Sequence, residues 1–478
     1  MSEGTTFYIT TPIFYPNANL HMGHAYSTTL SDIIARYQRL QGKEVYFLTG
    51  ADENAGTVVR AAKKAGQETY MYLDHIVANF KDLFSKLEIS YDQFIRTSDE
   101  TAHWSGAKEL WNRIAKAGDF EKRSYEGLYC VGHESFITEK DLVDGKCPDH
   151  NEVPQFLKEE NYFFKLSKYT ANIKEKIEKG ELEIVPQTRK NEILALLERG
   201  LEDVSFSRPA DKVSVGIPIP NDPTQKMYVW CDALANYISA LGFGSGDPTL
   251  YEKFWPADVH VIGKDILRFH AGIWLGMLLS AGLPLPKKIL VHSFITSGGK
   301  KMSKTLGNVI DPQQLIGEYG SEAVRYYLAR HISPFEDGDL TVERFKEVYN
   351  GELANGIGNL VSRVLKMAVT NGVAIPTEHH EILPLQYSEA FDHYKINDAC
   401  EVIWRKIQEA DKHIQDKQPF KLIKTNPEEA KKDIALLLVD VWKIAVMLEP
   451  LMPSTSATIQ TLLKENRMPE NPLFPRKD

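Results

Sequence analysis

The N-terminal half of this chain alternates between strand-like and helix-like segments, and that alternation limits the folds it can adopt. Residues 5–15 (TTFYITTPIFY) have the apolar, β-branched and aromatic composition of a buried strand. Residues 25–41 then place apolar side chains at helical spacing, and residues 43–50 (KEVYFLTG) form a second strand-like run. Strand–helix–strand units of this kind predict an α/β fold with a doubly wound parallel sheet.

The alternation is interrupted once and later lost. Residues 118–210 contain clusters of Gly, Cys, His and charged residues, which indicates an insertion. Strand and helix patterns return in residues 211–292 and lead into a loop rich in glycine and lysine. From about residue 345 the strand signals disappear, so we expect the C-terminal part to be a helical bundle.

The overall composition is that of an ordinary globular protein. The chain has 478 residues, 43% of them hydrophobic and 25% charged, and it has no apolar run of membrane-spanning length. Residues 1–12 lack the basic and apolar regions of a leader peptide, so we expect a cytoplasmic protein. A formal charge of −9 argues against a surface that binds nucleic acid everywhere, but it permits a local basic face. Cys231 and Cys400 stand alone and are expected to be reduced.

A pair of histidines lies where the first strand-like run gives way to a helix. His21 and His24 enclose Gly23, and this junction follows the carboxyl end of a strand, where parallel sheets bind ligands. Imidazole donors beside the free N–H groups of a helix N-terminus could bind phosphate oxygens, and Gly23 would let the backbone approach them. Two surface histidines at a helix start are the alternative, because a four-residue pattern is weak by itself.

A second basic motif lies far along the chain. Residues 297–308 (SGGKKMSKTLGN) combine a Gly-Gly pair with three lysines. Lys301 and Lys304 are three residues apart, so one helical turn would direct both ammonium groups to the same side. Two such charges could bind a triphosphate and stabilise its breaking bond. The alternative is a solvated, lysine-rich hairpin tip.

Together, the two motifs resemble the paired signatures of the class I aminoacyl-tRNA synthetases. The first signature, His-x-Gly-His, is matched by His21, Gly23 and His24. The second, Lys-Met-Ser-Lys-Ser, is matched at residues 301–304, with Thr305 in place of the last serine. Within that class, the segments TGADENAGT, VWCDALANYI, VIGKDILRFHAGIW and NGIGNLVSRV resemble the methionyl-tRNA synthetase family, and the resemblance covers nearly the whole chain.

The resemblance implies a two-step reaction. L-Methionine reacts with ATP and Mg²⁺ to give methionyl-adenylate and pyrophosphate, and methionine is then transferred to the 3′-terminal ribose of tRNA(Met). The catalytic residues that it implies are His21, His24, Lys301 and Lys304. The ATP-binding residues that it implies are His21, Gly23, His24, Gly263, Asp265, Lys301, Ser303 and Lys304.

The family's methionine pocket also maps onto this sequence. Its residues are Ile13, Tyr15, Asp52, Trp230, Ala233, Leu234, Tyr237, Ile266 and His270. The chemistry fits, because aromatic edges favour a polarisable thioether and a carboxylate at the end of a strand can bind an ammonium group. Without the resemblance, Trp230 would be assigned to the core, Asp52 to a helix cap, and Gly263 to a simple turn.

The insertion holds two Cys-x-x-His pairs, Cys130 with His133 and Cys147 with His150. Two thiolates and two imidazoles form a tetrahedral set that suits Zn²⁺, and the two-residue gaps suit a tight knuckle. The resemblance implies a structural zinc knuckle at this place, although the family usually has more cysteines here and some members lack the metal. A metal-free knuckle with polar surface histidines is the alternative.

The size of the insertion separates this chain from other synthetases. Relatives specific for Ile, Val and Leu insert a large editing domain, whereas only about ninety residues are available here, fewer than a typical domain has. A cysteinyl enzyme would need zinc ligands near Trp230, and none are found there. Two further classes are a nucleotidylyltransferase, which would have little use for the helical part, and a non-catalytic tRNA-binding relative, which would typically lose one of the two signatures.

The helical part carries a candidate tRNA-binding face. Residues 353–369 place apolar side chains on one helix face, with Asn359 and Arg363 on the opposite face. A solvated face is the alternative, but the resemblance implies that these two residues read the anticodon together with Phe420, which replaces the family's usual Trp. The chain ends shortly after the bundle, so we expect a monomer.

These observations predict five regions. Residues 1–117 and 211–292 form the two halves of a Rossmann-type catalytic domain, residues 118–210 form the connective insertion with the zinc knuckle, residues 293–345 contain the lysine loop and contact the tRNA stem, and residues 346–478 form the anticodon-binding domain.

Overall fold

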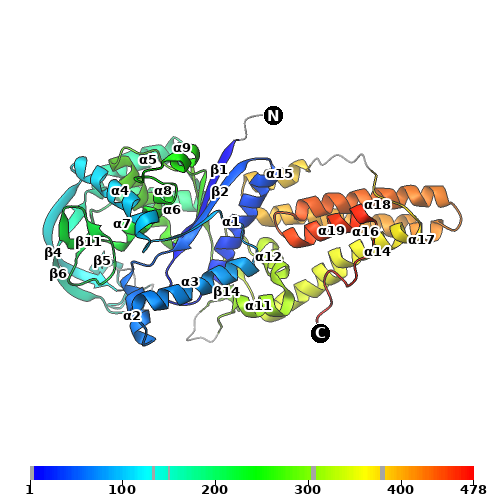
Figure 1. Ribbon diagram of the computed structural model, residues 1–478, viewed down its shortest axis with the longest axis horizontal. Coiled ribbons are helices and arrows are strands. Elements are labelled where there is room, and N and C mark those ends of the chain that lie inside the picture. Colours follow the sequence, from blue (N-terminus) through cyan, green and yellow to red (C-terminus); the bar gives the residue numbers. More distant parts are fainter. Residues whose placement is uncertain (1–4, 132–134, 149–150, 303–307, 377–382) are drawn as a thin grey trace. The chain divides into compact units, whose positions relative to one another are not determined.

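The computed structural model describes residues 5–131, 135–148, 151–302, 308–376 and 383–478 (Figure 1). The chain divides into two compact units, and each unit is assembled from separate stretches of sequence. The first unit comprises Met1–Leu20, Lys43–Asp82 and Ser90–His292, and the second comprises His21–Gly42, Leu83–Ile89 and Ser293–Asp478.

The first unit is built around a six-stranded parallel sheet with the order β3-β2-β1-β12-β13-β7. The strands are β1 (Thr6–Phe14), β2 (Glu44–Ala51), β3 (Gln93–Arg96), β7 (Glu183–Val185), β12 (Val259–Gly263) and β13 (Lys288–His292). The strand order reverses where β1 pairs with both β2 and β12, and sheets of this kind bind ligands beyond the carboxyl ends of the strands at such a point. The predicted parallel sheet is therefore confirmed.

The helices of the first unit are α2 (Gly56–Lys64), α3 (Thr69–Lys86, whose last turn belongs to the second unit), α4 (Ser105–Lys116), α5 (Thr170–Glu178), α6 (Gln187–Arg199), α7 (Val229–Leu234), α8 (Asn236–Ser239), α9 (Thr249–Phe254) and α10 (Leu275–Ser280). Short turns of π-helix lie at η1 (Glu100–Trp104) and η5 (Phe269–Trp274), and 3₁₀ turns at η2 (Glu139–Asp141), η3 (Leu166–Tyr169) and η4 (Lys264–Ile266). Strand β3 lies between α3 and α4 and is not evident in the sequence, because four residues are too few to show a strand period.

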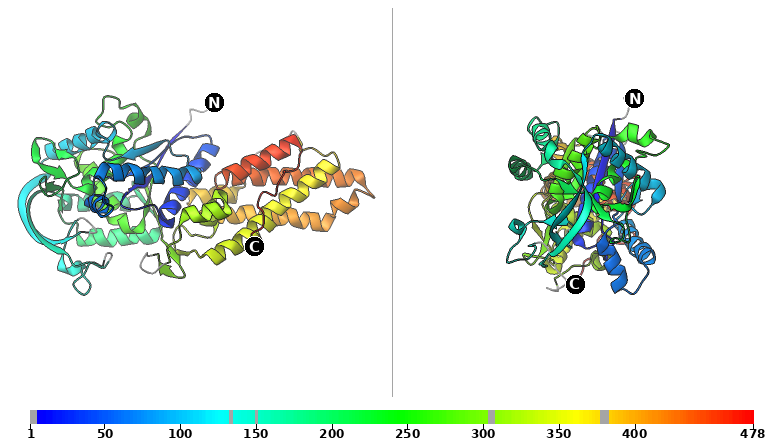
Figure 2. Two further views of the ribbon diagram at one scale, coloured as in Figure 1. Left: turned by 60° about the horizontal axis from the view of Figure 1, so that its bottom comes forward. Right: turned by 90° about the vertical axis from the view of Figure 1, so that its left-hand side faces the viewer.

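Part of the insertion forms antiparallel sheet. One sheet has the order β5-β4-β6-β8, with β4 (Phe120–Cys130), β5 (Ser135–Ile137), β6 (Gln155–Phe164) and β8 (Val204–Ser205). A second sheet contains β9 (Ser207–Pro209), β10 (Pro218–Ile219) and β11 (Asp222–Met227). Figure 2 shows β4 and β6 (cyan) as a long curved pair. The insertion also supplies β7, so it completes one edge of the parallel sheet.

The second unit is mainly helical. Its helices are α1 (Met22–Leu40), α11 (Pro312–Tyr319), α12 (Ser321–Arg330), α13 (Val342–Val348), the π-helical η7 (Tyr349–Gly358), α14 (Asn359–Thr370), α15 (Leu385–Asp392), α16 (Ile396–Lys417), α17 (Pro419–Leu422), α18 (Pro427–Leu448) and α19 (Pro453–Glu465). Helix α18 packs against α14, α16 and α19 to form the predicted bundle (Figure 1). Among the helices described, none is both long and apolar enough to cross a membrane.

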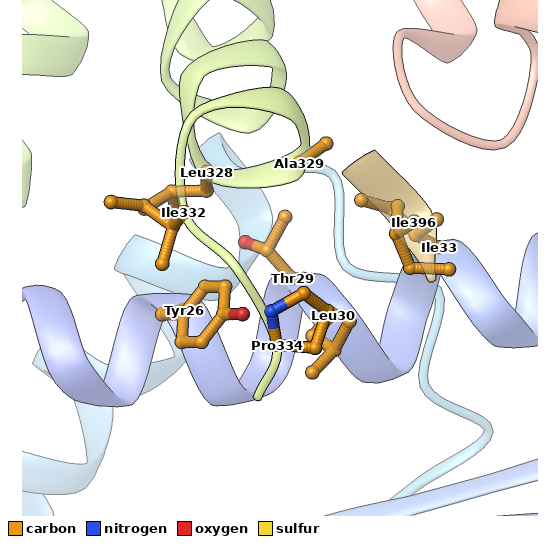
Figure 3. Close-up of a pocket in the computed structure, with 9 residues that line it drawn as sticks. All are labelled: Tyr26, Thr29, Leu30, Ile33, Leu328, Ala329, Ile332, Pro334 and Ile396. Carbon is orange, nitrogen blue, oxygen red and sulfur yellow. The ribbon is translucent and has the colours of Figure 1, made fainter. Parts of the chain in front are cut away.

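Helix α1 packs against α12 within the second unit. Figure 3 shows Tyr26, Thr29 and Leu30 of α1 facing Leu328 of α12 and Ile332, which follows that helix. The apolar positions that predict a helix at residues 25–41 are Leu30, Ile33, Ile34, Tyr37 and Leu40, and the first four of these are buried. Tertiary packing, rather than helix propensity, therefore determines where this helix lies.

A buried ion pair also joins α1 to α12. Arg325 Nη1 lies 2.7 Å from Asp32 Oδ2, and both side chains are fully buried. The same guanidinium donates hydrogen bonds to three backbone carbonyls, those of Leu87 (2.9 Å), Pro450 (3.0 Å) and Leu451 (2.8 Å). One arginine thus connects α1, α12, the end of α3 and the turn between α18 and α19.

Candidate active site

The two signature histidines cap the N-terminus of α1. His21 is the N-cap residue, and its Nδ1 accepts a hydrogen bond from the Gly23 N–H (3.0 Å). In return, Nδ1 of His24 accepts a hydrogen bond from the backbone N–H of His21 (3.1 Å). This reciprocal pattern is a capping box. The Gly23 N–H is therefore not free to bind phosphate as the sequence suggests, because His21 accepts its hydrogen bond.

The capping box fixes the tautomer of both rings. Since Nδ1 is an acceptor in each, the proton of the neutral ring lies on Nε2. The ring centroids of His21 and His24 are 3.8 Å apart. Burial, together with the neighbouring His21 ring, lowers the pKa of His24 well below its usual range. His24 is thus a neutral imidazole that carries an N–H donor.

The structure explains why residue 23 is a glycine. A Cβ at this position would lie 2.9 Å from Cε1 and 3.1 Å from Nδ1 of His21. Side-chain atoms do not approach a Cβ this closely without moving, so any other residue would displace the His21 ring from the helix terminus. The glycine therefore permits the cap itself.

The lysine loop begins in a tight hairpin. Strand β14 (Ile295–Ser297) pairs antiparallel with β15 (Lys300–Lys301), and Gly298 and Gly299 connect them with φ angles of 62° and 71°. Two positive φ values are typical of a type I′ turn, in which glycine is favoured. Asp339 Oδ1 accepts hydrogen bonds from the Gly299 N–H (2.9 Å) and the Thr296 hydroxyl (2.8 Å).

Lys301 therefore lies in a strand, and not in the helical turn that the spacing of Lys301 and Lys304 suggests. A Gly-Gly dipeptide favours a hairpin, and the hairpin keeps the next residues extended. Ser303 and Lys304 lie outside the described residues, so their placement stays a prediction.

Asp52 lies directly beyond the carboxyl end of β2. Its N–H donates to the carbonyl of Phe14 (2.9 Å), and the residue is only 3% exposed. Helix α2, which follows, has Ala55 as its N-cap, so the alternative of Asp52 as a helix cap is wrong. Ile13 and Tyr15 are half-buried at the end of β1, where the register against β2 shifts between Thr10 and Ile13.

Tyr237 and His270 form a buried hydrogen-bonded pair. His270 Nδ1 donates to the carbonyl of Ile266 (3.0 Å), which leaves Nε2 as an acceptor for the Tyr237 hydroxyl (2.7 Å). Burial lowers the pKa of His270 to about 4, so its ring is neutral at physiological pH. Burial also raises the pKa of Tyr237. Both groups therefore stay uncharged at physiological pH.

A second neutral imidazole, which the sequence analysis missed, supports this pair. His260 stacks against the Tyr237 ring at a centroid distance of 4.2 Å. Its Nε2 accepts from the Trp274 indole (3.3 Å) and its Nδ1 donates to the Thr10 hydroxyl (2.8 Å). Burial lowers the pKa of His260 well below its usual range. A polar residue within the apolar run VHVIG is the signal that could have indicated it.

Trp230 lies at the start of α7 and stacks face to face on Phe269, with centroids 3.9 Å apart and planes within 6°. It is half-buried, so it is neither a core residue nor a surface residue. Ala233 and Leu234 are buried on the same helix. Phe269, which the sequence analysis did not select, positions the indole ring.

Gly263 and Asp265 lie two residues apart at the carboxyl end of β12. Gly263 is the last residue of the strand and has extended backbone angles, so it is not a simple turn. A Cβ at Gly263 would lie 2.7 Å from Asp265 Oδ1. The Asp265 side chain is exposed and Ile266 is half-buried.

A buried arginine that the sequence analysis missed lies near the C-terminal end of the insertion. The Arg208 guanidinium lies over the rings of Tyr228, Tyr129 and Phe136, at 4.7, 5.4 and 5.5 Å from their centroids. Its Nη1 also donates to the hydroxyl of Ser205 (2.9 Å). Cation–π contacts of this kind hold the antiparallel sheet against the residue that precedes α7.

Of the four candidate zinc ligands, the structure describes the two cysteines. Cys130 ends β4, and the Cys147 carbonyl accepts a hydrogen bond from the Asn151 N–H (2.7 Å). Each cysteine is 1% exposed. His133 and His150 lie outside the described residues, and within those that are described no group of three or more potential ligands is found.

The candidate anticodon face lies on α14 and α17. Asn359 is exposed at the start of α14, and Arg363, one turn later, forms an ion pair with Asp411 of α16 (2.9 Å). Leu360, Val361, Val364, Leu365 and Ala368 are buried, as predicted. Phe420 lies on the short helix α17 with 46% of its surface exposed, so its ring is accessible for stacking.

Comparison with known proteins agrees with this arrangement. The family model described as tRNA synthetases class I (M) matches residues 7–153 and 150–365. The methionine–tRNA ligase of Clostridium acetobutylicum is 43% identical over 97% of this chain and 74% of its own length. The methionine–tRNA ligase of Thermotoga maritima is 41% identical over 95% of this chain and 74% of its own length.

Solved structures show the same similarity. Mycobacterium tuberculosis methionyl-tRNA synthetase in complex with methionyl-adenylate has a TM-score of 0.92, at 35% identity, covering 99% of this chain and 100% of the other. The apo form of that enzyme has a TM-score of 0.85, at 33% identity, covering 100% and 99%.

The parallel sheet, its switch point and the histidine cap define a class I aminoacyl-tRNA synthetase. Within that class, the matched family model and the relatives also identify the family of this protein. It belongs to the methionyl-tRNA synthetase family.

Proposed function

We propose that this protein is a methionine–tRNA ligase that activates L-methionine with ATP and transfers it to tRNA(Met). The observation that carries this proposal is the neutral, buried Tyr237–His270 pair, which lies on the same unit as the Asp52 carboxylate. A carboxylate for the ammonium group and an uncharged aromatic pair beside a polarisable thioether match the two ends of methionine. The relatives' names agree with this substrate.

In the first step, the methionine carboxylate attacks the α-phosphorus of ATP. A carboxyl–phosphate bond forms, the bond to the β-phosphate breaks, and pyrophosphate leaves. We assign the stabilisation of the developing phosphate charge to the Nε2–H donors of His21 and His24 and to the ammonium groups of Lys301 and Lys304. Gly23, Gly263, Asp265 and Ser303 complete the proposed ATP site.

In the second step, a terminal ribose hydroxyl of tRNA attacks the adenylate carbonyl, and AMP leaves. No enzyme nucleophile is required, so positioning and electrostatics account for the catalysis. Mg²⁺ bound with ATP would supply further charge neutralisation on the phosphates.

We propose that Ile13, Tyr15, Trp230, Ala233, Leu234 and Ile266 surround the methionine side chain, with Asp52 at its ammonium group. The edge of the Trp230 ring and the Tyr237–His270 pair favour sulfur over a purely aliphatic chain.

Pyrophosphate exchange tests the proposal directly. Purified protein is incubated with ATP, labelled pyrophosphate and each of the twenty amino acids in turn. Methionine alone is expected to support exchange, and tRNA(Met) is expected to accept it in a second assay. Exchange with another amino acid, or with none, would contradict the proposal.

We also propose that Cys130, His133, Cys147 and His150 hold a structural zinc ion. Two buried thiols, one of them at the end of a strand, fit half of a tetrahedral site. Metal analysis of protein purified without chelator is expected to give one zinc per chain, and Cys147→Ser is expected to lose it. A parent protein without zinc would overturn this proposal.

The assignment of Asn359, Arg363 and Phe420 to anticodon recognition is likewise a proposal, as is the five-region division at residues 117, 210, 292 and 345. Exposure of Asn359 and Phe420 supports the assignment, because unstacked bases need amide edges and aromatic faces.

We further propose that the protein is a cytoplasmic monomer. Light scattering is expected to give the mass of one 54.2 kDa chain, and a mass of twice that would contradict the proposal. Cell fractionation checks the location.

A further inference from the structure

Four polar side chains form a continuous hydrogen-bonded chain inside the first unit. Asn54 Nδ2 donates to Asp232 Oδ2 (2.7 Å), and His103 Nε2 lies 2.6 Å from Asp232 Oδ1. His103 Nδ1 lies 2.7 Å from the Ser239 hydroxyl. We name these residues the Asn54–Ser239 chain. His103 and Asp232 are fully buried and Ser239 is 4% exposed.

The proton positions in this chain follow from its chemistry. An ionised carboxylate only accepts hydrogen bonds, so Nε2 of His103 donates to Asp232. In a neutral ring Nδ1 is then an acceptor, and the Ser239 hydroxyl donates to it. The order Ser–His–Asp is that of a catalytic triad, but Ser239 is buried and therefore cannot attack a substrate.

The Asn54–Ser239 chain connects two parts of the proposed methionine site. Asn54 lies two residues after Asp52, at the carboxyl end of β2. Asp232 and Ser239 lie on α7 and α8, the helices that carry Ala233, Leu234 and Tyr237. The proposed ammonium-binding carboxylate and the proposed thioether-binding residues are thus joined through buried hydrogen bonds.

Further contacts hold both ends of the Asn54–Ser239 chain. Asn54 Nδ2 also donates to the carbonyl of Thr97 (2.9 Å), which accepts from the Trp104 indole as well (3.0 Å). At the other end, a Cβ on Gly106 of α4 would lie 2.5 Å from Ser239 Cβ. Helices α4 and α8 are therefore in direct contact at this point, which leaves α8 no room to move toward α4.

A buried polar chain costs free energy of desolvation that apolar residues of the same volume would avoid. What it provides instead is a fixed geometry, because each hydrogen bond is satisfied only at one distance and angle. Since both oxygens of Asp232 have partners, a shift of α7 relative to β2 would leave a buried carboxylate oxygen without a donor.

We propose that the Asn54–Ser239 chain sets the distance between Asp52 and the Tyr237–His270 pair, and so selects the amino acid by the length of its side chain. The inference rests on the proposed function. Its residues are positioning residues, since none of them belongs to the proposed pocket itself.

The test compares Asn54→Ala, His103→Leu and His103→Gln with the parent in methionine-dependent pyrophosphate exchange. Ethionine, which is one methylene longer than methionine, serves as the second substrate. We expect Asn54→Ala and His103→Leu to raise KM for methionine about tenfold and to lower the methionine-to-ethionine preference by a similar factor. KM for ATP is expected to stay within about twofold. His103→Gln, whose amide can still donate to Asp232, should recover part of the loss.

Ser280→Ala is the matched control. It removes a buried hydroxyl that donates to another carboxylate of the same unit, Asp119 (2.7 Å). Ser280 lies on α10 and does not belong to the Asn54–Ser239 chain. Ser280→Ala is expected to lower the melting temperature without changing either KM or the preference.

The outcomes separate the two claims. If the parent shows no methionine-dependent exchange, the proposed function is wrong and the inference falls with it. If the parent is active but folded Asn54→Ala keeps the parental KM and preference, the inference alone is overturned. Asn54 is only half-buried, so this variant decides the question even if His103→Leu does not fold.

Discussion

His270 shows at the scale of a residue how burial sets the chemistry of a site. Its ring is enclosed, its Nδ1 proton is held by the Ile266 carbonyl, and its pKa falls to about 4. A charged ring would repel the hydroxyl proton of Tyr237 and would be a poor neighbour for a thioether. The neutral form is therefore the one that the proposed function needs.

The low pKa of His270 predicts a pH dependence of stability. The unfolded state binds a proton near pH 6.5, but the folded state binds it only near pH 4, so acid favours unfolding between these values. The contribution of this group is complete above pH 6.5 and falls by about 3 kcal/mol by pH 4. Urea denaturation at several pH values, compared between the parent and His270→Gln, measures it.

The difference between the two proteins isolates His270 from other titrating groups, such as His260. The variant is expected to show a shallower loss of stability between pH 6.5 and 4. Parallel curves for parent and variant would mean that His270 does not carry the depressed pKa.

His24 has two separable roles, and substitutions can distinguish them. His24→Ala removes both the cap acceptor and the Nε2–H donor, and it is expected to reduce pyrophosphate exchange by about 10²–10³. Lys304→Ala is expected to cause a similar loss. Methionine binding, measured by calorimetry, should be largely kept in both variants.

His24→Asn provides the control, because its side-chain oxygen can still accept from the His21 N–H while the distal donor is absent. The Asn variant should recover the stability that loss of the cap costs, about 1 kcal/mol, but not the activity. Recovery of activity by asparagine would assign the effect to capping.

Residue by residue, the sequence identified chemistry better than it identified geometry. It selected His21, Gly23 and His24, yet it could not show that the imidazole of His21 folds back onto the Gly23 N–H. It did not select His103, because nothing in the polar segment around it distinguishes it from a surface histidine, and it overlooked His260, although the apolar run VHVIG around it was a signal. Their partners come from distant segments, such as Asp232 for His103 and Thr10 for His260.

At the scale of elements, Arg325 is the residue on which the placement of α1 depends most. Arg325→Met would remove one of the cationic partners of the buried Asp32, whose ion pair with Arg36 would stay, and would remove the donors to three carbonyls. We expect the free energy of unfolding to fall by about 3–5 kcal/mol. Urea denaturation followed by tryptophan fluorescence measures the change.

Two further variants test whether the Asp32–Arg325 ion pair accounts for this loss of stability. Asp32→Leu combined with Arg325→Met removes both charges, and it should be more stable than Arg325→Met alone. Arg36→Ala removes a partner that is 22% exposed, so it should cost less than about 1 kcal/mol. A double variant no more stable than the single one would contradict the ion-pair explanation.

The elements with long periodic patterns were predicted well, and the short ones were not. The helix expected at residues 25–41 is α1, and the runs at 5–15 and 43–50 are β1 and β2. Strand β3 has only four residues and β7 three, and both depend on neighbours in the parallel sheet for their backbone hydrogen bonds. Nothing local marks such strands, so only tertiary structure reveals them.

At the scale of the whole molecule, the two units differ in architecture and in proposed task. The first contains the parallel sheet and the proposed methionine residues, and the second contains the bundle with Asn359, Arg363 and Phe420. The change from strand and helix to helix alone was visible in the sequence near residue 345. The assembly of each unit from separate stretches was not, because it depends on contacts between distant segments.

This division predicts that tRNA recognition and amino-acid activation can be impaired separately. Arg363 is held by Asp411 on one side, so its guanidinium is pre-oriented on α14. Arg363→Ala is expected to lower kcat/KM for tRNA(Met) by about 10–100-fold, the cost of losing one arginine contact to a base. Pyrophosphate exchange without tRNA should stay unchanged, because Arg363 takes no part in adenylate formation.

Lys366→Ala, which removes an exposed charge one turn further along α14, is the matched control and should weaken charging less, with a smaller salt dependence. Charging kinetics with tRNA(Met) and with an anticodon variant measure both effects. Equal loss of exchange and charging in Arg363→Ala would show that this residue supports the fold rather than reads the anticodon.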